Sequence, residues 1–152
     1  MMRGVIFSAS TTHALRAAAW LAAHGGGEAI LGRDLARVLK IPPDYLSKVL
    51  ATLARSGVIT AARGAKGGYR LARAPERIRL VEVVAPFEGT RIKSACLFHP
   101  DRACRRSAAC SAHASWFGVN DAYREFLDET TLADIQGDVR KGRKLGTPRK
   151  QR

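Results

Sequence analysis

The segment from Ile41 to Ala72, IPPDYLSKVLATLARSGVITAARGAKGGYRLA, constrains the fold of this chain more than any other. Pro42 and Pro43 favour a helix start, because the first helical turn does not need the N–H that proline lacks. Apolar residues then recur at i, i+3, i+4 and i+7, which predicts a helix with one buried face formed by Leu46, Val49, Leu50 and Leu53. Gly57 supplies a C-terminal stop.

The residues after this helix predict a β-hairpin with a basic tip. Two strand-like runs, 58–61 and 69–72, flank a glycine-rich turn that holds Arg63, Lys66 and Gly67. Two helices are expected upstream. The first is capped by one of Ser8, Ser10, Thr11 and Thr12 and stopped by glycines 25–27. The second, in LGRDLARVLK, carries Leu35, Val38 and Leu39 on one face. This order of elements is that of a winged helix-turn-helix domain, whose third helix enters the major groove of DNA.

The rest of the chain predicts a shorter helical part. One helix fits RLVEVVAPFEG, a loop with the cysteines follows, and a long amphipathic helix ends near Ile135 with an apolar stripe of Trp116, Val119, Tyr123, Phe126 and Leu127. A second copy of the chain is a natural cover for this stripe, which predicts a homodimer.

We therefore expect a mostly α fold with a winged helix-turn-helix domain and a long C-terminal dimerisation helix. The expected parts are a DNA-binding domain over 1–79, a short helix and cysteine loop over 80–113, a dimerisation helix over 114–136, and a basic disordered tail over 137–152.

The charge distribution points to double-stranded DNA as the partner. The net charge is +13, and residues 1–79 hold 13 lysines and arginines against 4 acidic residues. Residues 80–137 are near neutral, whereas the last fifteen are again strongly basic. A membrane surface is the weaker alternative. No apolar run could span a membrane, and His13 and Arg16 interrupt the only stretch that resembles a secretory signal, so we expect a cytoplasmic protein.

All three cysteines of the chain, Cys96, Cys104 and Cys110, lie in one short segment with the spacing C-x7-C-x5-C. In the cytoplasm such clustered cysteines serve as metal ligands or redox thiols rather than as disulfide partners. Soft thiolate ligands suit an iron–sulfur cluster and Zn²⁺ about equally well. The arginines around them favour the thiolate form. Incidental thiols in a loop are the simpler alternative.

Four features together resemble the Rrf2 family of bacterial winged-helix regulators over residues 5–136. These are HALRAAAWLA (13–22), the run IPPDYLSKVLATLARSGVI, the hairpin ARGAKGGYRLA, and three cysteines before a long helix that leads to TLADI (131–135). The family includes IscR-like and NsrR-like iron–sulfur regulators. The chain departs from it at His13, where tyrosine is common, and in the longer gap after Cys96.

The resemblance implies a cluster held by Cys96, Cys104 and Cys110, with His113 as the fourth ligand in the manner of IscR-like members. It favours a [2Fe-2S] cluster, with [4Fe-4S] as the other possibility. NsrR-like members take an acidic residue from the first helix of the other subunit, and the aligned residue here, Thr12, is no obvious ligand. His99 is a spare candidate.

The resemblance also implies the DNA contacts: Asp44, Tyr45, Ser47 and Lys48 on the recognition helix, and Arg63, Lys66 and Gly67 in the wing. Lys48 can donate to guanine or to a phosphate, and Arg63 is expected in the minor groove. For Asp44 we favour a helix cap, and Tyr45 is equally consistent with half-buried packing. Gly67 and Gly68 are also expected to serve the turn itself.

The function predicted on these grounds is a homodimeric repressor of transcription that senses nitric oxide, redox state or iron–sulfur status through its cluster. The alternative is a regulator of the same fold that uses thiol-redox chemistry or zinc. A small iron–sulfur carrier or enzyme ranks below both. The chain carries no paired carboxylates or nucleophile motif, and the GAKGG glycines lack the Lys-Ser/Thr of a phosphate loop, so we expect no enzyme.

Overall fold

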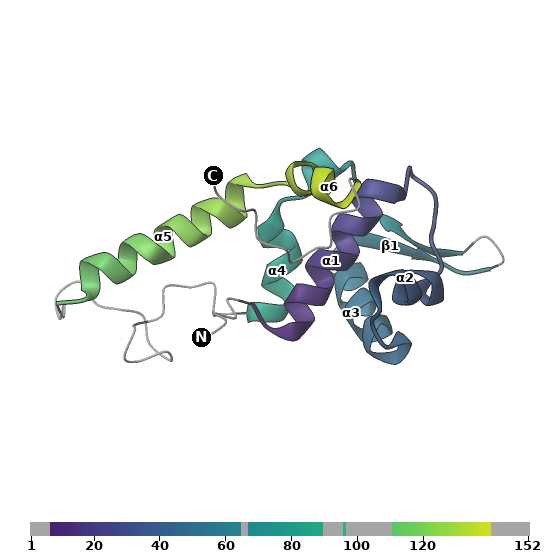
Figure 1. Ribbon diagram of the computed structural model, residues 1–152, viewed down its shortest axis with the longest axis horizontal. Coiled ribbons are helices and arrows are strands. Elements are labelled where there is room, and N and C mark those ends of the chain that lie inside the picture. Colours follow the sequence, from purple (N-terminus) through teal and green to yellow (C-terminus); the bar gives the residue numbers. More distant parts are fainter. Residues whose placement is uncertain (1–6, 65–66, 90–95, 97–110, 141–152) are drawn as a thin grey trace.

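The computed structural model describes residues 7–64, 67–89, 96 and 111–140 (Figure 1). In these ranges the chain forms helices and one two-stranded sheet: α1 (Ala9–His24), α2 (Gly32–Leu39), α3 (Pro43–Arg55), β1 (Ile59–Ala62), β2 (Gly68–Leu71), a 3₁₀ turn η1 (Pro75–Arg77), α4 (Leu80–Glu88), α5 (His113–Glu129) and α6 (Leu132–Arg140). The mostly helical winged helix-turn-helix fold is confirmed. No helix of this described part is long and apolar enough to cross a membrane.

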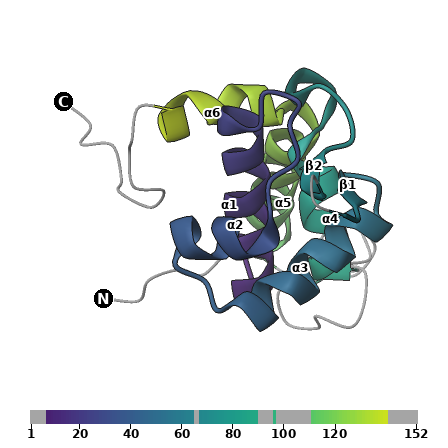
Figure 2. The same ribbon diagram turned by 90° about the vertical axis from the view of Figure 1, so that its right-hand side faces the viewer.

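Helix α1 is the centre of the fold and packs against α3, α4 and α6 (Figures 1 and 2). Ser8 is its N-cap and accepts a hydrogen bond from the Thr11 N–H, and Gly25 is its C-cap, so the predicted start and stop are confirmed. Small residues face the neighbouring helices: Ala14, Ala17 and Ala18 are fully buried. Their short side chains let the helices approach α1 closely.

Helices α2 and α3 form the helix-turn-helix unit in front of α1 in Figure 2. The predicted buried face of α3 is confirmed, and Gly57 follows its end with φ 77°. In α2 the prediction for Val38 is wrong, because its side chain is 54% exposed while Leu35 and Leu39 are buried. Ala36 takes its place on the buried face, since residues 35, 36 and 39 share one side of a short helix and residue 38 lies about 100° from its centre.

The hairpin forms the wing. Its strands pair antiparallel, with Ile59 opposite Leu71, one residue offset from the predicted limits. Strand β2 of the wing is tied to the segment before α2 by an isolated bridge between Ile30 and Tyr69. The Ile30 N–H donates to the Tyr69 carbonyl at 2.9 Å, and the Tyr69 N–H donates to the Ile30 carbonyl at 2.8 Å.

The predicted long C-terminal helix is two helices. Helix α5 ends at Glu129, Thr130 is extended, and α6 begins after Thr131, whose N–H and hydroxyl donate to the Asp134 carboxylate. Two backbone hydrogen bonds hold this joint to the start of α4 and the residues just before it. The Leu80 N–H donates to the Thr130 carbonyl, and the Leu132 N–H donates to the Ile78 carbonyl. At this joint the backbone N–H and C=O groups therefore find their hydrogen-bond partners in residues 78 and 80 rather than in one continuous helix.

Helix α6 packs back onto α1 (Figure 1). It also includes residues 137–140, so the predicted disordered tail is wrong for these four positions. Residues 141–152, the rest of that tail, lie outside the described ranges, as does most of the predicted cysteine loop.

Candidate nucleic-acid interface and metal-ligand segment

The outward face of α3 presents polar side chains. Asp44, Ser47 and Lys48 are exposed, whereas their neighbours Leu46 and Val49 are buried. Because the buried residues fix the rotation of the helix, the polar row has to face away from the core. The predicted cap by Asp44 is wrong: the N-cap residue is Pro42, and α3 has no side-chain cap. Asp44 lies in the first turn, where its negative charge interacts favourably with the positive end of the helix dipole and so stabilises α3.

A hollow of about 320 Å³ lies beside this face and joins α3 to the wing. Its lining comes from the starts of α2 and α3 and from β2: Gly32, Arg33, Pro43, Asp44, Ser47, Leu50 and Tyr69. Arg33 is exposed on the first turn of α2, where both its charge and the helix dipole attract anions. Arg33 was not predicted from the sequence as part of this surface, because it reaches the hollow only when α2 is packed beside α3.

Tyr45 points toward α1, so the packing alternative for this residue is the one that the structure supports. Its hydroxyl lies 2.7 Å from the Ser10 hydroxyl in a hydrogen bond. Its ring stands edge-on to the His13 ring, with centroids 5.5 Å apart and an angle of 82° between the planes. Tyr45 is half-buried as a result. A direct contact of Tyr45 with DNA stays a prediction.

In the wing, Arg63 is exposed near the tip, and Lys66 lies outside the described residues. Gly67 is buried, and its N–H donates to the Gly64 carbonyl at 2.9 Å. A Cβ at position 67 would come within 2.5 Å of the Ala62 carbonyl oxygen. Gly67 is therefore required by the turn, as expected, and its peptide N–H is used inside the wing.

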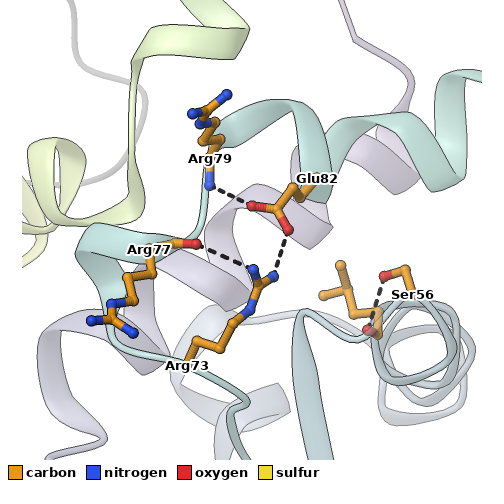
Figure 3. A network of polar contacts seen from close by, with 6 residues as sticks. Ser56, Arg73, Arg77, Arg79 and Glu82 are labelled. Atoms are coloured by element: carbon orange, nitrogen blue, oxygen red, sulfur yellow. Dashed lines mark hydrogen bonds and ion pairs between the residues drawn. The ribbon is translucent and has the colours of Figure 1, made fainter.

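The exit of the wing is held to α4 by a polar network (Figure 3). Arg73 forms an ion pair with Glu82 and also donates to the Arg77 carbonyl at 3.3 Å, and Glu82 accepts the Arg79 N–H at 3.0 Å. Burial on its own would raise the pKa of Glu82, but the hydrogen bonds from Arg73 and Arg79 and their charges outweigh it and hold the pKa below its usual value. This network was not predicted, because the partners are nine residues apart and meet only in the folded chain.

The metal-ligand segment is described only in part. Cys96 is half-buried, Cys104 and Cys110 lie outside the described ranges, and His113 is the first residue of α5 rather than the end of a loop. The His113 ring is 4.8 Å from the Phe117 ring one turn along. Among the described residues no group of three or more His, Cys, Asp or Glu is placed to hold a metal ion.

A buried carboxylate lies where this segment leaves α4. Glu88, the last residue of α4, accepts the Ser8 N–H at 2.9 Å and the Thr11 hydroxyl, and it is only 8% exposed. Burial, with a smaller contribution from the Glu88 charge, raises the pKa of Tyr123 on α5. Thr12 is exposed, and its hydroxyl donates to the Ser8 carbonyl at 3.0 Å. The end of α4 is thus bound to the first turn of α1.

Helix α5 extends away from the other helices (Figure 1). Of the predicted apolar stripe, Leu127 is buried in the core, Trp116 and Tyr123 are half-buried, and Val119 and Phe126 are 60% and 50% exposed. The stripe is therefore only partly covered by this chain.

Comparisons with known proteins agree with this geometry. Residues 7–138 match a protein family described as Rrf2, iron-dependent transcriptional regulator. The HTH-type transcriptional regulator NsrR of Bacillus licheniformis is 31% identical over 134 residues, which is 86% of this chain and 94% of that protein. The structure of T. potens IscR is similar with a TM-score of 0.72 and 25% identity, covering 95% of each chain. The oxidized form of Staphylococcus aureus CymR is similar with a TM-score of 0.67 and 26% identity, covering 86% of this chain and 94% of that one.

Proposed function

Because the chain belongs to the Rrf2 family of transcriptional regulators, we propose that it is a homodimeric repressor that binds operator DNA and senses its signal through an iron–sulfur cluster. The observation that carries the proposal is the exposed polar row of α3, which lines one hollow together with Tyr69 of the wing. This is the arrangement that a winged helix uses to place one helix in the major groove and a hairpin over the adjacent backbone.

In this proposal the DNA contacts divide into two kinds. Ser47 and Lys48 reach base edges in the major groove, where lysine prefers guanine, and Arg63 enters the minor groove. Arg33 binds the phosphate backbone at the start of α2, which fixes the register of the protein on the duplex without reading sequence. Lys66 and Gly67 belong to the same wing, with Gly67 acting through the shape of the turn.

The proposed dimer is formed by α5. Val119, Tyr123 and Phe126 are spaced at i, i+4 and i+7, so they lie along one side of the helix, and two of them are at least half exposed. The same helix of a second copy would cover this side by a twofold contact. Twofold symmetry then requires two similar half-sites about one helical turn of DNA apart.

The donor set of the metal-ligand segment fits an iron–sulfur cluster. Three thiolates, from Cys96, Cys104 and Cys110, and one imidazole, from His113, are ligand types that [2Fe-2S] centres use, and [4Fe-4S] is the other possibility. When bound, such a cluster supplies a centre that reacts with oxygen and nitric oxide. His113 opens α5, so a ligand at this position ties the sensor to the dimer helix. A change at the site would then alter the angle between the two DNA-binding units.

A regulator that uses thiol chemistry or zinc is the second candidate. The similarity to CymR, which has been solved in an oxidized form, favours it, because it shows a relative of this fold in an oxidized state. The two candidates share the DNA-binding surface and differ only in what Cys96, Cys104 and Cys110 hold.

Anaerobic purification followed by a visible spectrum and assays of iron, sulfide and zinc per chain separates the candidates. The proposal expects iron and sulfide in equal amounts with a brown chromophore, which nitric oxide bleaches. A colourless protein without iron after reconstitution would overturn the cluster, and stoichiometric zinc would support the second candidate.

Variants at the two histidines of the same segment sharpen this test. His113→Ala should reduce the iron content or shift the spectrum, whereas His99→Ala should change neither. If His99→Ala had the larger effect, the ligand assignment would be wrong. Loss of both the iron and the visible absorption in a Cys104→Ser variant would support this segment as the holder of the metal.

A further inference from the structure

One face of α1 holds the helix-turn-helix unit. Ser10, His13 and Arg16 follow one another at intervals of three residues, which places them along one side of the helix. Ser10 and His13 contact Tyr45 of α3, and Arg16 contacts Leu39 of α2. These contacts are additional to the hydrophobic core, to which α1 contributes Ala14, Ala17, Ala18, Leu21 and Ala22.

The contacts to α3 converge on one side chain. The hydroxyls of Ser10 and Tyr45 are 2.7 Å apart, and the His13 ring stands against the Tyr45 ring with centroids 5.5 Å apart. Tyr45 directly precedes the buried Leu46 and lies two residues before Ser47, at the end of α3 that faces DNA in the proposed function. A tyrosine held at both its ring and its hydroxyl can adopt few orientations, so it restricts the rotation of α3 about its axis.

The contact to α2 is at the turn between the two helices. One terminal nitrogen of Arg16, Nη2, donates to the Leu39 carbonyl at 2.6 Å, and the other, Nη1, lies 3.4 Å from His13 Nδ1. Leu39 is the last residue of α2, and Lys40 after it adopts the left-handed conformation with φ 54°. A lysine keeps this conformation only where its surroundings impose it. Arg16 supplies such a constraint, because it holds the carbonyl immediately before Lys40.

We propose that Arg16 is a positioning residue for sequence-specific DNA binding, acting through the turn at Lys40 and, with His13 and Ser10, through Tyr45. Helix α3 starts at Pro43, three residues after Lys40, so the geometry of this turn sets the tilt of α3. Base-edge hydrogen bonds require placement within a few tenths of an ångström, whereas attraction to phosphates tolerates larger errors. Loss of Arg16 should therefore reduce specific binding far more than non-specific binding. This inference rests on the proposed DNA-binding function.

The test first identifies a binding site and then compares variants. Wild-type protein selects duplexes from a random-sequence pool, and fluorescence anisotropy then measures Kd for the best selected duplex and for a scrambled duplex at one salt concentration. The variants are Arg16→Gln, Arg16→Lys and Tyr45→Phe. Arg77→Gln is the matched control, because it removes one positive charge from an exposed side chain in η1.

We expect Arg16→Gln to weaken binding to the selected duplex by about ten- to a hundred-fold, the range that a mismatched base pair causes. Binding to the scrambled duplex should weaken only as much as in Arg77→Gln, by about two-fold. Arg16→Lys should recover part of the loss, because lysine can donate to the Leu39 carbonyl but not reach His13 as well. Tyr45→Phe, which keeps the ring and removes only the hydroxyl, should show a smaller loss of the same kind.

Urea unfolding of each variant shows whether it is folded at the assay temperature. If Arg16→Gln is not folded, Tyr45→Phe still tests the proposal. Equal ratios of specific to non-specific affinity in wild type, Arg16→Gln and Tyr45→Phe would overturn the positioning role while leaving the proposed function intact. Failure of the wild type to select any duplex would instead overturn the proposed function, and the positioning role with it.

Discussion

Replacing Gly68 by alanine should detach the wing from the domain, and the size of the effect follows from the backbone around it. Gly68 has φ 138°, and a Cβ built on it would lie 2.5 Å from the carbonyl oxygen and 2.6 Å from the carbonyl carbon of Ile30. Both are backbone atoms that cannot rotate away. Ile30 would have to move from Tyr69, and the two hydrogen bonds between these residues would be lost.

Each of these hydrogen bonds contributes about 1 kcal/mol to the free energy of unfolding. The positive φ adds roughly 1–3 kcal/mol for any residue with a Cβ. We therefore expect Gly68→Ala to lower the free energy of unfolding by about 3–5 kcal/mol, a large share of the stability of a domain of this size.

Gly64→Ala is the matched control. Gly64 lies at the other end of the wing turn with φ 107°, and a Cβ there would meet no atom of the described residues within 4 Å. It should show only the conformational cost, so the two variants should differ by about 2 kcal/mol, the contribution of the bridge to Ile30. Urea unfolding followed by circular dichroism measures this difference. Equal midpoints for the two variants would refute the reasoning.

Three further outcomes are expected. Because the pKa of Glu82 is lowered, its ion pair with Arg73 stabilises the fold above the ordinary value of 4.5, and this contribution is lost as the pH falls below that value. Glu82→Gln should therefore cost about 0.5 kcal/mol near neutral pH, after allowance for exposure, and progressively less below pH 4.5 in urea unfolding. Burial, and then the Arg16 charge, lower the pKa of His13 below 6.5, so the unfolded state binds the proton more readily and the free energy of unfolding falls as the pH drops through 6.5. The His13→Phe variant lacks this group, so its free energy of unfolding should fall less than that of the wild type between about pH 7.5 and 5.5. Parallel pH dependence in the two proteins would contradict this. Val119→Asp should shift the protein toward monomer in sedimentation, whereas Asp128→Lys, nine residues on and half a turn around α5, should not.

The elements with strong local signals could be predicted from the sequence. Helix α3 carries four apolar residues at helical spacing between a proline pair and a glycine, so its bounds and its buried face were both correct. Helix α2 is only eight residues long, and in so short a helix Val38 and Ala36 were equally plausible on the buried side. The packing of α2 against both α3 and α1 decides between them.

The break between α5 and α6 had a local signal that the apolar stripe concealed. Thr131 and Asp134 form a cap of the Ser/Thr-x-x-Asp/Glu type, which marks a helix start in the sequence. The apolar stripe ends at Leu127, three residues before the break at Thr130, so it does not indicate that a separate helix follows. The contacts that fix the joint, from Leu80 to Thr130 and from Leu132 to Ile78, pair residues about fifty positions apart, and no local pattern contains them.

For the candidate site, the sequence identified which side chains are exposed on α3 but not what holds that helix in place. The contacts of Tyr45 with Ser10 and His13, and of Arg16 with Leu39, join residues of different helices that are more than twenty positions apart in the sequence. Hydrogen bonds of this kind have no periodicity, so they can be found only after the helices have been placed.

These contacts make the first turns of α1 a junction between the two proposed functions of the chain. Glu88, at the end of α4, binds Ser8 and Thr11, and Ser10 in the same turn binds Tyr45 on α3. The segment with the proposed cluster ligands begins directly after α4. A rearrangement there that moves Glu88 must either carry the first turn of α1 with it or break two hydrogen bonds to a buried carboxylate, which costs about 3 kcal/mol or more. Because Ser10 in that same turn binds Tyr45, a displacement of the turn would also act on α3, the helix proposed to bind the operator.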